Sequence, residues 1–154
     1  MSGVRREAKD LLSMRTDSAI SSQRPTIGRL RGEMSKKICL IEDDELVRER
    51  VALQLRELGY DVLQADDGEQ GLAAIEREKP DAAVIDILMP GKDGLETITA
   101  IRRVHPHIRI VAVSAGGRVG PRIYLDLAKQ VGADATLVKP IKAEDLRSAI
   151  EGAA

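Results

Sequence analysis

The sequence predicts an α/β fold, a doubly wound parallel sheet of five strands with helices on both faces. Two observations carry this prediction. Short apolar runs of four to six residues alternate five times with longer segments in which apolar residues recur every three or four positions. These are the patterns of buried strands and of amphipathic helices. Strand–helix units in series give parallel strands joined by right-handed crossovers, which place helices on both faces of the sheet.

The five apolar runs are predicted to be the strands. Most of them are near-continuous aliphatic runs, which is typical of strands buried on both faces of a parallel sheet. The second run is more polar, which indicates an edge strand. We therefore expect the flavodoxin-like order 2-1-3-4-5, because that order places the second strand at an edge. In chain order, the predicted strands are Ile38–Ile41, Asp61–Gln64, Ala82–Ile87, Arg109–Ser114 and Ala135–Val138.

Each predicted strand is followed by a segment with helical periodicity. The first segment has apolar residues at i, i+4, i+8 and i+11 from Val47, and Gly59 stands where a glycine often ends a helix. The second and third segments end before a proline, which cannot continue a helix. The predicted helices are 47–58, Gly68–Glu78 and the segments marked by Leu95–Ile101, Ile123–Val131 and Ala143–Ile150.

The composition excludes several classes of protein. Phe and Trp are absent and Tyr occurs twice, so the core must be aliphatic. With 24 basic and 25 acidic side chains and no aromatic platforms for base stacking, we expect no nucleic-acid binding by the domain itself. The single Cys39 excludes an intrachain disulfide, and no apolar run approaches the roughly 20 residues of a membrane span. We therefore expect a cytoplasmic protein.

Charge divides the chain into two parts. Residues 1–33 hold seven basic and four acidic side chains, a net charge of +3, and contain few large apolar residues. Such a segment cannot bury enough surface to offset the entropy of ordering, so we expect a disordered basic extension. The domain itself is expected over residues 36–152, and Met34 would make a natural start. We also expect no effector domain after the last predicted helix, because the sequence ends at Ala154.

Polar residues follow four of the predicted strands. Ligand sites in open parallel sheets lie beyond the carboxyl ends of the strands, where the strand order reverses. Glu42, Asp43 and Asp44 follow the first strand and Asp86 ends the third, whereas Ser114 and Lys139 end the fourth and fifth. The order 2-1-3-4-5 makes these strands neighbours. We therefore expect three or four carboxylates, a hydroxyl and an ammonium group at one edge.

Each of these residues has an ordinary structural explanation when it is taken alone. Asp44 is predicted to cap the following helix rather than to act in a site. Asp86 is harder to explain in this way, because it interrupts an apolar strand and a lone buried carboxylate is costly. Carboxylates with room for water and phosphate are typical of Mg²⁺ sites, and a carboxylate can also form an aspartyl phosphate. Mg²⁺ and Lys139 would then neutralise phosphoryl oxygens.

At these residues the chain resembles the receiver domain of bacterial two-component response regulators, of the stand-alone, single-domain type. The resemblance covers about residues 36–152, and its motifs are specific as a set. They are Ile41-Glu42-Asp43, the run from Asp86 to Gly94 (DILMPGKDG), Ser114, and Lys139-Pro140.

The resemblance implies a role for each of these residues. Asp86 would accept a phosphoryl group from a histidine kinase or a histidine phosphotransfer protein. Asp43, Asp86 and the backbone carbonyl of Leu88 would hold Mg²⁺, and Glu42 would help through water. The protein would then signal by docking on an unknown downstream protein, and would catalyse only its own phosphorylation and dephosphorylation. Ser114 and Lys139 would contact the phosphoryl group, and the Lys139–Pro140 peptide would be cis.

The sequence also departs from the family pattern. The family usually has Tyr or Phe three residues before the lysine, and here that position is Thr136. A small β-branched side chain cannot follow the strand-four hydroxyl inward as an aromatic ring does. The loop from Ala115 to Arg122 is long and rich in glycine, which permits rearrangement. We therefore expect this loop and the helix start near Tyr124 to carry the signal.

Three alternatives remain open from the sequence. One is an aspartyl-phosphate-forming phosphatase of the haloacid dehalogenase type, but that class needs a general acid two residues after the nucleophile, where this chain has Leu88. A receiver that works without phosphorylation is disfavoured by the intact set of site residues. A nucleotide cradle in the glycine-rich loop is disfavoured because that loop lacks GxGxxG and the P-loop Lys-Ser/Thr pair.

Overall fold

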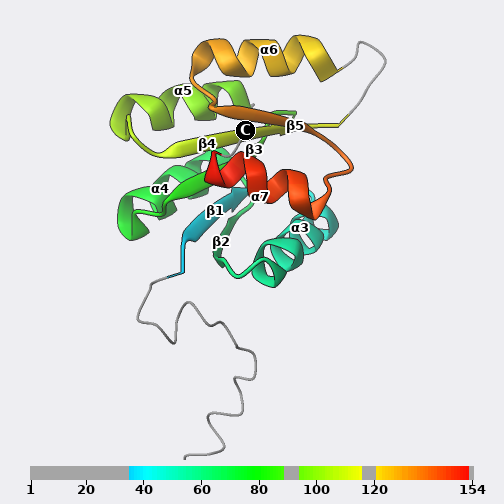
Figure 1. Cartoon of the computed structure of the whole chain (residues 1–154). Helices are drawn as coiled ribbons and strands as arrows, with labels where there is room; N and C mark the ends of the chain where they lie inside the picture. The colour runs from blue at the N-terminus through cyan, green and yellow to red at the C-terminus, as the bar shows by residue number, and fades with distance from the viewer. Residues whose placement is uncertain (1–34, 89–93, 116–120, 153–154) are drawn as a thin grey trace, which may run out of the picture. The chain divides into compact units, whose positions relative to one another are not determined.

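The computed structural model describes residues 35–88, 94–115 and 121–152. Strands and helices alternate along this part of the chain (Figure 1). The strands are β1 (Lys37–Ile41), β2 (Asp61–Ala65), β3 (Ala82–Asp86), β4 (Arg109–Ser114) and β5 (Ala135–Val138). The helices are α3 (Glu45–Glu57), α4 (Gly68–Glu78), α5 (Gly94–Val104), α6 (Pro121–Val131) and α7 (Ala143–Glu151).

The five strands form one parallel sheet in the order β2-β1-β3-β4-β5, so the predicted fold class and strand order are confirmed. The more polar β2 lies at one edge, as predicted, and the short β5 lies at the other. β1, β3 and β4 are central, and nearly all of their residues are buried. This burial explains why their sequences read as continuous aliphatic runs.

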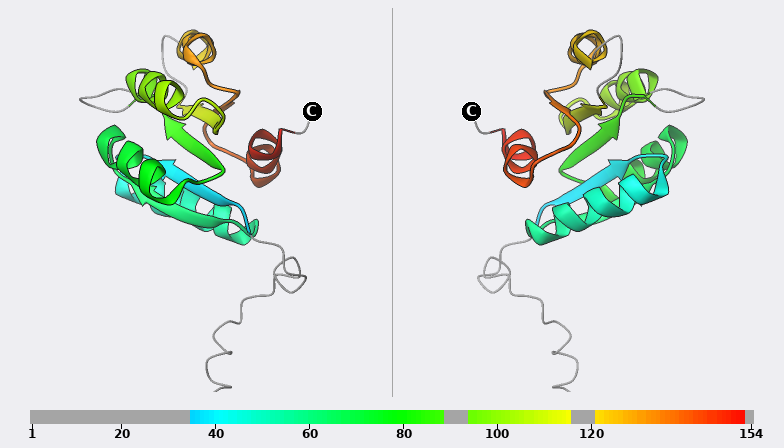
Figure 2. Two further views of the ribbon diagram at one scale, coloured as in Figure 1. Left: turned by 90° about the vertical axis from the view of Figure 1, so that its left-hand side faces the viewer. Right: turned by 90° about the vertical axis from the view of Figure 1, so that its right-hand side faces the viewer.

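Helices cover both faces of the sheet and make two aliphatic cores. Alternate strand residues point to opposite faces. Cys39 and Ile41 of β1 therefore pack with α4, α5 and α6, whereas Ile38 and Leu40 pack with α3 and α7. Figures 1 and 2 show these two helical layers from three directions.

Helix α6 forms where the apolar spacing predicts it, but its largest apolar residues are not all buried. The spacing of Ile123, Leu127 and Val131 predicts the helix correctly, but Ile123 is 52% exposed and Leu127 is 38% exposed. The buried residues are Leu125 and Ala128. Because α6 packs over β4, β5 and α5, its inward face is set by that contact and not by its most apolar residues.

Some sequence predictions fall on residues that the structure does not describe. These are the disordered extension at residues 1–33 and the central part of the glycine-rich loop, residues 116–120. Residues 89–93 of the motif after β3 are also outside the described ranges. Within those ranges, the structure contains no helix that combines the length and the apolar character of a membrane span.

Candidate functional site

The register of the sheet brings the predicted site residues to one edge. Ile41 of β1 pairs with Ile85 of β3, so Glu42 and Asp86, the next residues along, lie side by side. Asp86 in turn pairs with Val113 of β4, and Ser114 pairs with Val138 of β5. Parallel strands end at the same edge, and therefore residues that are far apart in sequence converge at the carboxyl ends of β1, β3, β4 and β5.

Lys139 lies between two buried carboxylates. Its Nζ donates a hydrogen bond to Oε1 of Glu42 at 2.8 Å and another to Oδ2 of Asp86 at 3.2 Å. Glu42 is 4% exposed and Asp86 is 6% exposed. The backbone N–H of Lys139 also donates to the carbonyl of Ser114 at 2.9 Å, which ties the lysine to the end of β4. The Lys139–Pro140 peptide is cis, as the resemblance implies.

Burial and crowding shift the proton affinities of this group. Burial raises the pKa of Glu42 to about 7, and the charge of Asp86 adds to this effect, although the hydrogen bond from Lys139 opposes it. Burial alone would lower the pKa of Lys139, but the hydrogen bond to Glu42 and the charge of Asp86 raise it overall. Lys139 therefore stays a cation. Its single positive charge is shared between the carboxylates of Glu42 and Asp86.

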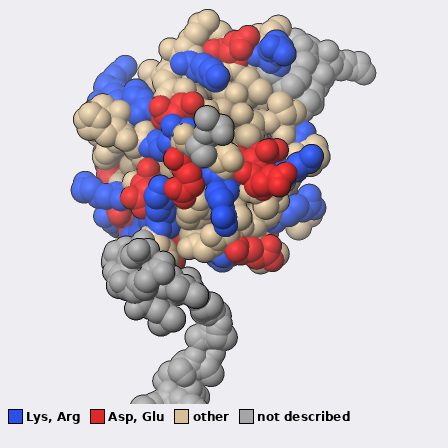
Figure 3. Space-filling view, viewed as in Figure 1, with Lys and Arg blue, Asp and Glu red and all other residues tan. Residues whose placement is uncertain are grey.

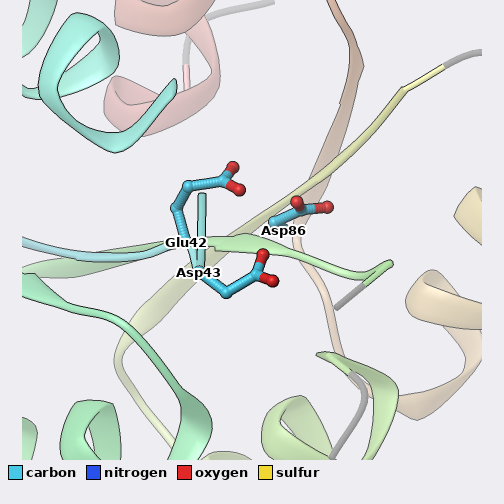
Figure 4. A group of neighbouring side chains, drawn as sticks. All are labelled: Glu42, Asp43 and Asp86. Carbon is cyan, nitrogen blue, oxygen red and sulfur yellow. The ribbon is translucent and has the colours of Figure 1, made fainter. Parts of the chain in front are cut away.

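A third carboxylate completes the acidic cluster. Glu42, Asp43 and Asp86 each offer an oxygen, and these oxygens lie within 4.8 Å of one another. Figure 4 shows Glu42 and Asp43 leaving the end of β1 on either side, with Asp86 reaching them from β3. Asp43 is exposed, unlike the other two. Three hard oxygen donors, one of them open to solvent, fit an ion such as Mg²⁺ that keeps several waters.

The loop that carries these acids is fixed from several directions. The Glu42 N–H donates to the carbonyl of Ala65 at 3.1 Å, and the Asp44 N–H donates to Oε2 of Glu42 at 3.2 Å. Asp44 caps α3, as predicted, because its Oδ1 accepts from the N–H of Val47 at 3.0 Å. Sequence reasoning missed a further contact, in which Nη1 of Arg48 donates to the Glu42 carbonyl at 2.9 Å.

The segment after Asp86 is held just as closely. The N–H of Leu88 donates to Oδ1 of Asp86 at 3.0 Å, which orients the carboxylate. The start of α5 packs onto the same segment, because a Cβ built on Gly94 would lie 2.4 Å from Cα of Ile87 and 2.6 Å from the Asp86 carbonyl oxygen. Only glycine allows that approach. No sequence signal other than the family motif points to this glycine.

Ser114 and Thr136 are placed differently from the acids. Ser114 is fully buried, and its Oγ donates to the carbonyl of Ala115 at 3.2 Å. Thr136 lies on the edge strand β5, half-buried and paired with Ala112. The structure therefore places Glu42, Asp43, Asp86 and Lys139 in one cluster. Ser114 lies beside that cluster at the end of the neighbouring strand, whereas Thr136 sits further back along β5.

The chain matches a known family over most of its length. Residues 38–151 match the family model of the response regulator receiver domain. The transcriptional regulatory protein PdtaR of Mycobacterium tuberculosis is 34% identical over 119 residues, which cover 75% of this chain and 55% of PdtaR. PhoP of Bacillus subtilis, the alkaline phosphatase synthesis transcriptional regulatory protein, is 30% identical over 118 residues, or 77% of this chain and 48% of PhoP.

Solved structures agree with this match. The chemotaxis protein CheY4 of Vibrio cholerae superposes with a TM-score of 0.70 at 27% identity, over 79% of this chain and 100% of that one. A response regulator receiver domain protein from Clostridium thermocellum gives a TM-score of 0.70 at 28% identity, over 77% of this chain and 93% of that one. The chain spans about half the length of the curated relatives that it matches. It belongs to the response regulator receiver domain family of two-component systems.

Proposed function

We propose that Asp86 is phosphorylated by a histidine kinase or a histidine phosphotransfer protein. The observation that carries the proposal is a buried carboxylate at the end of β3 whose Oδ2 is 3.2 Å from the Lys139 ammonium group. An oxygen of Asp86 forms a bond to phosphorus as the bond from phosphorus to the donor's histidine nitrogen breaks. That nitrogen keeps the electron pair, and Lys139 stabilises the negative charge that remains on the phosphoryl oxygens.

The acidic cluster would hold Mg²⁺ in this reaction. Asp43, Asp86 and the Leu88 carbonyl would be its protein ligands, and Glu42 would act through water. Bound there, Mg²⁺ would neutralise phosphoryl oxygens that three carboxylates would otherwise repel. Asp43 is the exposed member of the cluster, and so it is the acid best placed to meet an ion arriving from solvent.

Ser114 is proposed to report the phosphorylated state. Its hydroxyl donates to the Ala115 carbonyl at 3.2 Å. A phosphoryl oxygen on Asp86 would be a stronger, charged acceptor, because charge-assisted hydrogen bonds are about twice as strong as neutral ones. A hydroxyl that exchanges partners in this way has different contacts in the two states, which is what a switch requires.

The signal is proposed to leave the domain by protein docking. Blue and red side chains are interspersed on the face drawn in Figure 3, and a mixed surface of this kind does not favour binding to a nucleic-acid backbone.

We propose that the segment after Ser114 and the start of α6 carry the conformational change, because Thr136 cannot act as an aromatic switch. Hydrogen exchange with and without beryllofluoride should then show its largest change within residues 115–127. An unchanged α6 beside a protected β5 would contradict this route.

Phosphorylation itself can be tested with a small phosphodonor. The protein is incubated with acetyl phosphate and Mg²⁺, and the modified peptide is located by mass spectrometry. We expect one phosphoryl group on Asp86, no incorporation into Asp86→Asn, and normal incorporation into the control Asp145→Asn, which changes an exposed aspartate of α7. Equal labelling of Asp86→Asn and the parent would refute the proposal.

The phosphatase alternative is not favoured. The family model that matches is the receiver domain, and Leu88 occupies the position where that phosphatase class needs an acid. A direct check is the hydrolysis of a chromogenic phosphomonoester by the unmodified protein. We expect no turnover beyond the slow loss of phosphate from Asp86.

A further inference from the structure

Arg48 connects the acidic loop to an edge strand that contributes no residue to the acidic cluster. It lies in the first turn of α3 and is half-buried. Its Nη1 donates to the carbonyl of Glu42 at 2.9 Å, and its Nε donates to Oε1 of Gln64 at 3.2 Å. Gln64 belongs to β2. The planar guanidinium group therefore holds two acceptors at once, which a lysine in this position could not do with the same geometry.

Hydrogen bonds hold the peptide groups on both sides of Glu42. The Glu42 N–H is bonded to the carbonyl of Ala65, also in β2, and the Glu42 carbonyl is bonded to Arg48. With both backbone groups of Glu42 engaged, the peptide plane that leads to Asp43 cannot rotate freely. Asp43 itself is exposed, and its direction is therefore set by its backbone and not by packing of its side chain.

We propose that Arg48 is a positioning residue for divalent-cation binding, and that it works by orienting Asp43 through the Glu42 carbonyl. This inference rests on the proposed function, because it assumes that the acidic cluster holds Mg²⁺. Arg48 does not touch the ion. It acts as groups behind metal ligands commonly do, by holding a ligand in the direction that the ion requires.

Charge and positioning predict opposite results when Arg48 is removed. Arg48 is a cation close to an acidic cluster, and its charge alone weakens the binding of another cation. On electrostatic grounds, Arg48→Ala should therefore bind Mg²⁺ more tightly than the parent. If positioning dominates, Arg48→Ala should bind Mg²⁺ about tenfold more weakly, which is the usual size of the effect when a group behind a metal ligand is lost. The sign of the change separates the two accounts.

The experiment is calorimetric titration of the whole chain with Mg²⁺ in four variants. Arg48→Ala should bind about tenfold more weakly than the parent. Gln64→Ala keeps the arginine but removes its second acceptor, and it should weaken binding in the same direction by a smaller factor. Arg50→Ala removes the same charge from an exposed position of α3 and should bind as the parent does or slightly more tightly. Arg48→Lys keeps the positive charge but loses the planar guanidinium group that reaches both acceptors. Its Mg²⁺ affinity should therefore be close to that of Arg48→Ala.

A second measurement tests the mechanism without metal. In the metal-free protein, the amide of Glu42, which donates to the Ala65 carbonyl at 3.1 Å, should exchange with solvent faster in Arg48→Ala than in the parent, whereas amides in α7 should be unchanged. Unchanged or tighter Mg²⁺ binding in folded Arg48→Ala would overturn the inference. If that variant does not fold, an unchanged affinity in Gln64→Ala would overturn it. A parent that binds no Mg²⁺ would overturn the metal site of the proposed function together with this inference.

Discussion

Two lysine–glutamate pairs in the described part of the chain have the same contact distance, but the pKa values of their glutamates shift in opposite directions. Lys139 meets Glu42 at 2.8 Å within the site, and Lys36 meets Glu151 at 2.8 Å near the end of α7. The pKa of Glu42 is raised to about 7, with burial as the largest cause. The pKa of Glu151 is instead lowered, first by the hydrogen bond from Lys36 and then by one from Tyr60.

The difference lies in burial and in the number of acids that share one cation. The Glu42 side chain is 5% exposed and competes with Asp86 for Lys139, whereas the Glu151 side chain is 37% exposed and has two donors. Glu151 is thus a satisfied surface carboxylate. Glu42 is a carboxylate that the fold buries at a cost, and a group perturbed in this way is typical of functional sites. Contact distance alone would not have separated the two pairs.

Removing the lysine of each pair should give the largest contrast. Lys139→Met leaves two buried acids without a cation, and we expect it to lower the free energy of unfolding by about 2 kcal/mol, less than a fully buried pair would lose. Lys36→Met should cost less than about 1 kcal/mol, as exposed ion pairs do. Urea unfolding at pH 7 without Mg²⁺ measures both. Equal losses in the free energy of unfolding would mean that burial does not make the Lys139 pair more important for stability than the Lys36 pair.

Neutralising the exposed acid of the site should separate function from stability. Asp43→Asn removes one of three clustered negative charges, so without metal it should be at least as stable to urea as the parent. It should nevertheless bind Mg²⁺ more weakly and be phosphorylated more slowly. The matched control is Asp145→Asn in α7, which should change none of the three. A strongly destabilised Asp43→Asn would show that this carboxylate is structural.

The site at the sheet edge could be predicted from the sequence, whereas the surface pair could not. Asp86, Ser114 and Lys139 could be assigned to one edge, because they lie at the ends of strands whose order was predicted from the more polar second strand. The Lys36–Glu151 pair joins residues 115 positions apart at the surface, and no local sequence pattern predicts it. Arg48 was missed for a similar reason, since an arginine at a helix start resembles any solvated charge until its acceptors are known. The exposed side of α6 depended on tertiary packing in the same way.

Acid should weaken the surface pair in a predictable direction. Because the pKa of Glu151 is lower in the folded state than its ordinary value of 4.5, its contribution to stability is present above that value and is lost as pH falls through the lowered pKa. The groups that face Glu151 are Lys36, Tyr60 and Arg147. Glu151→Gln should therefore lose less stability than the parent when urea unfolding is compared between pH 6 and pH 3. Parallel curves would mean that Glu151 contributes nothing measurable.

The smallest expected effect concerns the residues before Lys36. The composition of residues 1–33 predicts a segment with too little apolar surface to order itself. A chain that begins at Met34 keeps Lys36, and with it the pair to Glu151. Changes that touch nothing usually stay within about 0.5 kcal/mol, and about 1 kcal/mol moves the midpoint of such a domain by roughly 4–8 °C. We therefore expect the thermal midpoint to move by less than about 4 °C, with no change in the rate of Asp86 phosphorylation. A larger drop in the midpoint would show that residues 1–33 dock on the domain. A slower rate at an unchanged midpoint would show that they act on the phosphorylation reaction without supporting the fold.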